Sequence, residues 1–303
     1  MLGYDCNLAC DYCTITVPMR ARALSSRAVA AALREGSRDG FSAVSFTGGE
    51  PTIRADLLPL VREARRLGYD DIKVQTNGLL LSDANLSRLL EAGVTRIHVS
   101  IHTHEREAYE RKVRRSDVYD AMESGLRRVV AANVEAHADL IVEAETMHRL
   151  PDAVRWLVER GVQRGFLWYV SLTDQNRDRI ESLPRIRDAL PWMHQAFRAA
   201  EAGGMDLRSL HVPRCLLGED AERAHDPGAR RVRVITPEAT FELRDAKLTP
   251  GMHVPACSGC EHEDYCPGIR RDYVEVFGDE EIASARGVAP RIAPTRQLPV
   301  VAS

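Results

Sequence analysis

The chain has 303 residues, of which 44% are hydrophobic and 28% are charged, which is ordinary for a globular protein with one α/β domain and a small appendage at most. Its formal net charge of −3 gives no general attraction to nucleic acid or to an anionic membrane, so neither is predicted as a partner. No apolar run is long enough to cross a bilayer and no segment resembles a signal peptide, which predicts a cytoplasmic protein.

Apolar strand patterns alternate with amphipathic helix patterns through the first two thirds of the chain. The predicted strands are 43–46, 72–76, 96–101, 135–142 and 165–170, and the predicted helices are 26–38, 55–67, 83–92, 118–132, 151–160 and 185–202. We expect left-handed helix ends at Gly68, Gly93, Asn133 and Gly161, and N-caps at Ser82 and Ser116. This alternation predicts a parallel sheet covered by helices, with ligands beyond the carboxyl ends of the strands.

The alternation stops near residue 204. A hairpin-like stretch at 231–243 and a group of cysteines follow, and the segment after 286 carries three prolines and no core pattern. We therefore predict a core domain at 1–203, a cysteine-rich region at 204–285 and a mobile tail at 286–303.

Three cysteines near the start of the chain have the spacing C-x3-C-x2-C. They are Cys6, Cys10 and Cys13, and Tyr12 stands just before the third. Thiolates are soft ligands that suit iron–sulfur clusters, and three of them on one loop leave one iron of a 4Fe-4S cube without a protein ligand. A zinc site with two or three of these thiolates and a histidine is the alternative.

Four segments taken in order resemble the radical S-adenosylmethionine (radical SAM) superfamily. After the cysteine loop come S-F-T-G-G-E-P at 45–51, Q-T-N-G at 75–78 and V-S-I-H at 99–102. The resemblance covers roughly residues 1–280 and implies an α/β fold, a partial (β/α)6 barrel. The first barrel strand would then fall within residues 1–5, so either the start is misassigned or that strand is a stub.

The resemblance also implies roles for individual residues. Cys6, Cys10 and Cys13 would hold a 4Fe-4S cluster whose open iron chelates S-adenosylmethionine (SAM), and one electron would cleave SAM to a 5′-deoxyadenosyl radical that abstracts hydrogen from a substrate. The implied cofactor-binding residues are Tyr12, Thr47, Gly48, Gly49, Glu50, Asn77 and Ser100. The glycines would let the methionine part of SAM approach the backbone, and the Glu50 carboxylate or nearby carbonyls would accept from its ammonium group.

Several of these residues have a plainer interpretation. Asn77 and Ser100 could simply cap turns at strand ends. His102 and His104 are interpreted as proton carriers or, more simply, as histidines without a catalytic role. The basic run at 111–115 either supplies one arginine to the SAM carboxylate or forms a solvated helix face.

A second set of cysteines lies in the last third of the chain. Cys257, Cys260 and Cys266, with the distant Cys215, supply four thiolates, enough for a second 4Fe-4S cluster. The set resembles the twitch form of the SPASM extension. It departs from the full SPASM pattern, because the position four after Cys266 is Arg270 and no further cysteine follows. We therefore predict one auxiliary cluster; a four-thiolate zinc site, or a cluster without Cys215 and with an open iron, are the alternatives.

The predicted function is a radical SAM enzyme of the oxidoreductase or maturase type. Its expected cofactors are SAM, the SAM-binding 4Fe-4S cluster and the auxiliary 4Fe-4S cluster, and its expected electron donor is a low-potential protein such as flavodoxin or ferredoxin. The substrate is a peptide or a small molecule. The alternatives are a non-enzymatic iron–sulfur electron-transfer protein and a zinc-stabilised binding module.

Overall fold

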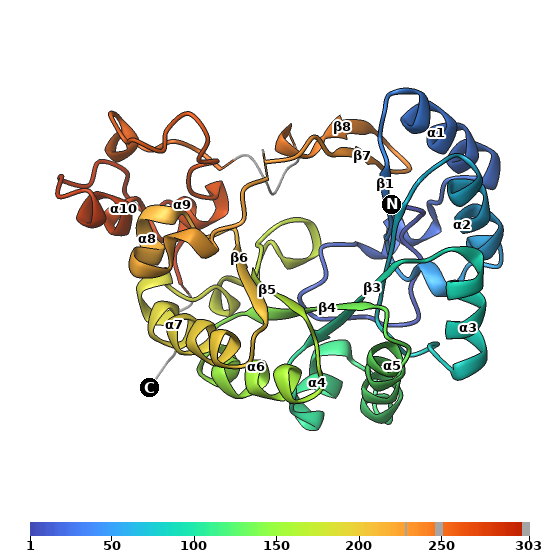
Figure 1. Cartoon of the computed structure of the whole chain (residues 1–303). Coiled ribbons are helices and arrows are strands. Elements are labelled where there is room, and N and C mark those ends of the chain that lie inside the picture. The colour runs from blue at the N-terminus through green and yellow to red at the C-terminus, as the bar shows by residue number, and fades with distance from the viewer. Residues whose placement is uncertain (228, 246–250, 299–303) are drawn as a thin grey trace. The chain divides into compact units, whose positions relative to one another are not determined.

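The computed structural model describes residues 1–227, 229–245 and 251–298 (Figure 1). It divides into two compact units. Unit 1 contains Met1–Asp139, Trp156–Gly165 and Ile235–Thr240, and unit 2 contains Leu140–Arg155, Phe166–Val234 and the chain from Phe241 onward. No helix among the described residues is both long and apolar enough to span a membrane.

The strands form a six-stranded sheet in the order β1 to β6. The strands are β1 (Ala43–Phe46), β2 (Asp71–Thr76), β3 (Arg96–His102), β4 (Glu135–Val142), β5 (Arg164–Tyr169) and β6 (Asp206–Leu210). β1 pairs with β2 and β2 with β3 in parallel, with Val44 opposite Ile72 and Val74 opposite Ile97. The predicted α/β class, with a mostly parallel sheet and cysteines in the C-terminal region, is confirmed.

Five helices belong to unit 1, and α1, α2 and α3 lie along one side of its strands (Figure 1). They are α1 (Ser26–Arg38), α2 (Leu57–Arg66), α3 (Asp83–Ala92), α4 (Arg106–Val113) and α5 (Tyr119–Ala131). Ile72 and Val74 of β2, like Val61 and Ala64 of α2, are fully buried. Burial of such side chains, worth roughly 1.5–3 kcal/mol for each larger one, holds the helices on the sheet.

The predicted helix ends are confirmed at most positions. Gly68, Gly93, Asn133 and Gly161 all have positive φ, and the Ser82 hydroxyl accepts from the Asn85 N–H at the start of α3. The predicted N-cap at Ser116 is wrong, because Val118 holds that position and makes no side-chain cap. The Glu110 carboxylate accepts from the Val118 and Tyr119 N–H groups instead, so a side chain of α4 caps α5.

The sequence analysis did not predict the sixth strand, β6. The remaining elements are helices and a hairpin. They are α6 (Leu150–Glu159), α7 (Ile186–Ala202), α8 (Arg214–Leu217), the 3-10 helix η6 (Gly218–Arg223), α9 (Arg271–Phe277), α10 (Glu280–Ala285), and the hairpin strands β7 (Arg233–Ile235) and β8 (Thr240–Glu242). The hairpin was predicted. In the described part of the final segment, the Asp279 carboxylate accepts from the Arg291 and Ile292 N–H groups.

Candidate functional site

The cysteine loop is fastened to the end of α4 through its backbone. The Ala9 N–H donates to the Val113 carbonyl at 3.3 Å, and the Asp11 N–H donates to the Lys112 carbonyl at 2.8 Å. These carbonyls belong to the last turn of α4, where no partner within the helix is available, and the next residue, Arg114, is left-handed with φ of 52°. The loop therefore caps a helix, and the helix fixes the path of the loop.

Backbone amides already point at two of the loop sulfurs. The Cys6 Sγ accepts from the Leu8 N–H and the Cys13 Sγ accepts from the Ile15 N–H, both at 3.4 Å. The Arg20 guanidinium donates to the carbonyls of Cys6 at 3.2 Å and Leu8 at 2.8 Å, which braces the same turn. Hydrogen bonds to cysteine sulfur are among the features that tune iron–sulfur clusters.

The thiolate forms of the three loop cysteines are disfavoured unless a cation binds to them. Burial raises the pKa of Cys10 to about 12, and the neighbouring Cys13 and Cys6 add to the rise. Burial also raises the pKa values of Cys6 and Cys13. A cation bound by all three would reverse these shifts, since metal ligands bind as thiolates, so the donor set fits an iron–sulfur cluster.

The Gly-Gly-Glu segment packs directly against the residues that precede the cysteine loop. The Gly49 N–H donates to the Gly3 carbonyl and the Glu50 N–H donates to the Asp5 carbonyl, both at 2.8 Å. A Cβ on Gly48 would lie 2.2 Å from the Gly3 oxygen, and one on Gly49 would lie 2.0 Å from the Asp5 oxygen. The glycines are thus required for close approach within the chain itself, which the sequence analysis did not predict.

Residues 2–5 run beside the end of β1 without forming a regular strand. The Leu2 N–H donates to the Thr47 carbonyl at 2.7 Å, and Gly3 forms an isolated antiparallel bridge with Ala23. These bonds set the entry of the chain into the cysteine loop. The sixth strand of the sheet is supplied by β6 and not by this segment.

The Glu50 carboxylate is buried, at 3% exposed, and is surrounded by donors from two strand ends. Its Oε1 accepts from the Thr52 N–H at 2.9 Å, the Thr52 hydroxyl at 2.6 Å and the Thr76 hydroxyl at 2.7 Å. Its Oε2 accepts from the Asn77 N–H at 2.7 Å. Glu50 therefore joins the segment after β1 to the end of β2.

Asn77 links the end of β2 to the cysteine loop. Its Nδ2 donates to the Asn7 Oδ1 at 2.7 Å, and its Oδ1 accepts from the Leu79 N–H at 3.1 Å. The predicted turn-capping interaction is present, and the bond to Asn7 is an additional one. The Arg115 guanidinium donates to the Asn7 carbonyl at 3.1 Å, so this loop residue is held from two sides.

A buried cluster of polar side chains in unit 1 contacts Tyr12 through His102. The Asp139 carboxylate approaches the His98 Nε2 at 3.2 Å, the His102 Nδ1 at 3.5 Å and the Ser100 hydroxyl at 3.4 Å. The His102 ring packs on the Tyr12 ring with centroids 4.5 Å apart, and its φ of 67° is left-handed. Burial lowers the pKa of His102 to about 4, so this histidine is neutral at physiological pH.

The basic run at 111–115 is only partly a solvated face. Arg111, Arg114 and Arg115 are exposed, whereas Lys112 is 1% exposed. The interpretation as a solvated helix face is therefore wrong for Lys112. The Lys112 carbonyl accepts from the Asp11 N–H, so this buried residue of α4 helps to hold the cysteine loop.

In unit 2 the four remaining cysteines line one pocket. This open pocket is lined by Cys215, Cys257, Cys260 and Cys266 together with other residues that include His253, His262 and Arg286. Burial raises the pKa of Cys215 to about 11, with further increases from Cys266, Cys257 and Cys260. Cys215 is thus close to the other three despite its distance in sequence. Arg270, by contrast, is buried in an ion pair with Asp272.

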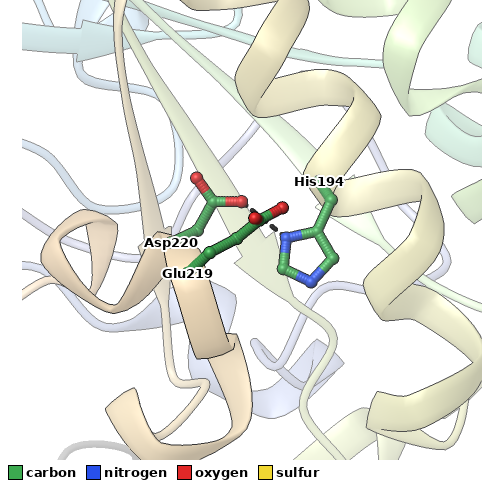
Figure 2. Close-up of side chains that lie close together, drawn as sticks. All are labelled: His194, Glu219 and Asp220. Carbon is green, nitrogen blue, oxygen red and sulfur yellow. Dashed lines mark hydrogen bonds and ion pairs between the residues drawn. The ribbon is translucent and has the colours of Figure 1, made fainter.

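One further group in unit 2 has the spacing of ligands to a single ion (Figure 2). Ligand atoms of His194, Glu219 and Asp220 lie within 4.8 Å of one another, and among the described residues no set of three cysteine sulfurs does so. His194 Nδ1 is 2.5 Å from the Asp220 carboxylate, which also pairs with Arg223 at 3.0 Å. The contact between His194 and Asp220 joins α7 to η6.

Comparison with known proteins gives curated relatives that match part of the chain, among them two probable GTP 3′,8-cyclases. A probable GTP 3′,8-cyclase of Sulfurisphaera tokodaii is 27% identical over 163 residues, which are 53% of this chain and 51% of the relative. A probable GTP 3′,8-cyclase of Saccharolobus solfataricus is 32% identical over 130 residues, 43% of this chain and 42% of the relative. The chain therefore matches about half the length of these relatives.

Among solved structures, Streptococcus suis SuiB bound to S-adenosylmethionine matches with a TM-score of 0.59 at 15% identity, covering 68% of this chain and 48% of that one. At that identity the likeness concerns the fold. The family model of the radical SAM superfamily matches residues 2–182, which include the cysteine loop, the Gly-Gly-Glu segment and β1 to β5. The chain belongs to the radical SAM superfamily.

Proposed function

We propose that this radical SAM enzyme holds an open 4Fe-4S cluster on Cys6, Cys10 and Cys13 and binds SAM beside it. The observation that carries the proposal is the loop itself: three partly buried thiols with raised pKa values, two of them already accepting backbone N–H bonds. Such a cluster, when reduced, supplies the electron that cleaves SAM to a 5′-deoxyadenosyl radical.

The protein's contribution is to hold the loop and to orient SAM. We assign SAM contacts to Tyr12, Thr47, Gly48, Gly49, Glu50, Asn77 and Ser100. Because the Glu50 carboxylate already accepts from four donors, the backbone carbonyls of its segment are the better acceptors for the ammonium group of SAM. Asn77 acts mainly by fixing Asn7 of the loop.

We further propose one auxiliary 4Fe-4S cluster on Cys215, Cys257, Cys260 and Cys266, in a twitch-like region at 204–285 that follows a core at 1–203. Its support is the convergence of the four cysteines on one pocket. Cys260→Ala should lower the iron content of anaerobically reconstituted protein by about one cluster. Unchanged iron with a loss of zinc would assign the site to zinc instead.

The proposed substrate is a peptide or a small molecule, and both classes have support. The curated relatives are named for a reaction of GTP, whereas SuiB has been solved with its precursor peptide SuiA. A low-potential donor such as flavodoxin or ferredoxin would supply the electron, and we place the enzyme in the cytoplasm. Hydrogen transfer into 5′-deoxyadenosine from deuterated candidates of each class would identify the substrate.

The test of the reaction class is formation of 5′-deoxyadenosine. Reconstituted protein would be incubated anaerobically with SAM and dithionite, and the product measured by mass spectrometry. We expect formation by the wild type and none by Cys6→Ala, Cys10→Ala or Cys13→Ala. Each of these variants should keep the iron of the auxiliary site. Unchanged cleavage in all three variants would contradict the assignment of the loop.

A further inference from the structure

Tyr109 of α4 is completely buried, at 0% exposed, yet its hydroxyl has no hydrogen-bond partner among the described residues. Its ring packs edge-on against Tyr119, with centroids 5.8 Å apart. A buried hydroxyl without a partner is costly, and such groups are rare in native structures unless a ligand or water completes them. We therefore expect this hydroxyl to have a hydrogen-bond acceptor that the described residues do not supply.

Tyr109 lies in α4 about one turn before the residues that hold the cysteine loop, and the negative charges that act on it belong to the same region. Burial is the main reason that its pKa is raised, and the negative charges of Cys10, Glu110, Glu50 and Cys6 follow as causes. Two of these groups belong to the cysteine loop and one to the Gly-Gly-Glu segment. The last turn of α4, just beyond Tyr109, holds the same loop through the carbonyls of Lys112 and Val113.

We propose that the Tyr109 hydroxyl is a hydrogen-bond donor to the anionic group assembled at the cysteine loop, either a sulfur of the cluster or the carboxylate of bound SAM. This inference rests on the proposed function. Both acceptors carry negative charge and need donors in a buried site. A bond to cluster sulfur raises the reduction potential, whereas a bond to the carboxylate strengthens SAM binding.

The neighbouring tyrosine provides a matched control. The Tyr119 hydroxyl already donates to the His104 carbonyl. Tyr119→Phe therefore removes a bond that exists with or without cofactors. Tyr109→Phe removes a hydroxyl that gains its partner only when the site is loaded.

The first readout is thermal unfolding with and without the cluster. Before reconstitution, Tyr109→Phe should be as stable as the wild type or more stable, because the lost hydroxyl had no partner. After anaerobic reconstitution with SAM present it should gain less in Tm than the wild type does. Tyr119→Phe should lower Tm in both states. A Tyr109→Phe variant that loses stability equally in both states would overturn the inference.

The second readout separates the two acceptors. The loop cluster is identified as the electron paramagnetic resonance signal that changes when SAM is added, and its midpoint potential is measured without SAM. A tenfold loss in the reduction equilibrium, ~59 mV downward for one electron, would assign the bond to cluster sulfur. An unchanged potential with weaker SAM binding would assign it to the carboxylate.

A Tyr109→Phe variant that loads with iron, yet keeps the wild-type potential and the wild-type affinity for SAM, would overturn the inference while leaving the proposed function intact. A wild-type protein that takes up no cluster on the cysteine loop would overturn the proposed function, and this inference with it. The two failures are therefore told apart by the iron content and the spectrum of the wild type.

Discussion

Replacing Glu50 by glutamine changes one atom of a buried carboxylate whose surroundings consist of donors. The wild-type oxygens accept two N–H groups and two hydroxyls, from Thr52, Thr76 and Asn77. A glutamine side chain presents one oxygen and one NH2 group. Whichever way the amide is turned, a donor then meets a donor in a site that is 3% exposed.

The less costly orientation of the glutamine can be identified from these contacts. Its oxygen would replace Oε1 and keep the Thr52 and Thr76 donors, while its NH2 group would face the Asn77 N–H. One hydrogen bond to a charged acceptor is lost, at roughly 1.5–3 kcal/mol, and the buried Asn77 N–H has no acceptor. The other bonds weaken as the acceptor loses its charge, so we expect the free energy of unfolding to fall by about 3 kcal/mol.

Urea denaturation of the metal-free protein measures this loss without interference from clusters. Glu63→Gln is the control, because the Glu63 carboxylate pairs with Arg34 and Arg66 at the surface and its loss should matter far less. The Glu50→Gln variant should also take up less cluster on reconstitution, since Asn77 holds the cysteine loop through Asn7. A loss below about 1 kcal/mol for Glu50→Gln would refute the reasoning.

Three other outcomes follow from the site. The unfolded pKa of a histidine is about 6.5, and that of folded His102 is about 4, so His102 should lower the free energy of unfolding of metal-free protein by about 3 kcal/mol between pH 6.5 and 4 and leave it constant above pH 6.5, measured in urea. Burial also lowers the pKa of His137 to about 4, which adds to the same fall; a flat profile there would contradict the burial of neutral imidazoles. Gly49→Ala, whose Cβ would meet the Asp5 oxygen at 2.0 Å, should lower stability by about 1–3 kcal/mol in the same assay. Chelation of iron should speed amide exchange at Ala9 and Asp11, which cap α4; unchanged exchange would show that the loop is ordered without metal.

Sequence patterns predicted most of the sheet, because long periodic segments carry both helix and strand signals. The strand at 43–46 and the helices at 26–38 and 83–92 agree with the structure to the residue. β6 was missed because only Leu207 and Ser209 face inward in a five-residue strand. The boundaries at 203 and 285 and the mobile tail remain predictions.

The candidate site was predictable only where the signal is local. The spacing of Cys6, Cys10 and Cys13 is readable in eight consecutive residues. The contacts that support the loop are not, because they join residues far apart in sequence, such as Asn7 with Asn77 and Ala9 with Val113. Tyr109 is of the same kind: nothing in its neighbours along the chain indicates a buried hydroxyl without a partner.

The bond between the Tyr4 hydroxyl and the Glu238 carboxylate has a consequence for the order of events during synthesis. Glu238 also pairs with Arg22, and it lies 234 positions after Tyr4. At roughly 5–20 residues per second, the ribosome needs about 12–47 s to make the intervening chain. The residues leading into the cysteine loop therefore leave the ribosome long before this anchor exists. Iron delivered early would meet a loop that lacks part of its support, so we expect cluster insertion to be completed after translation.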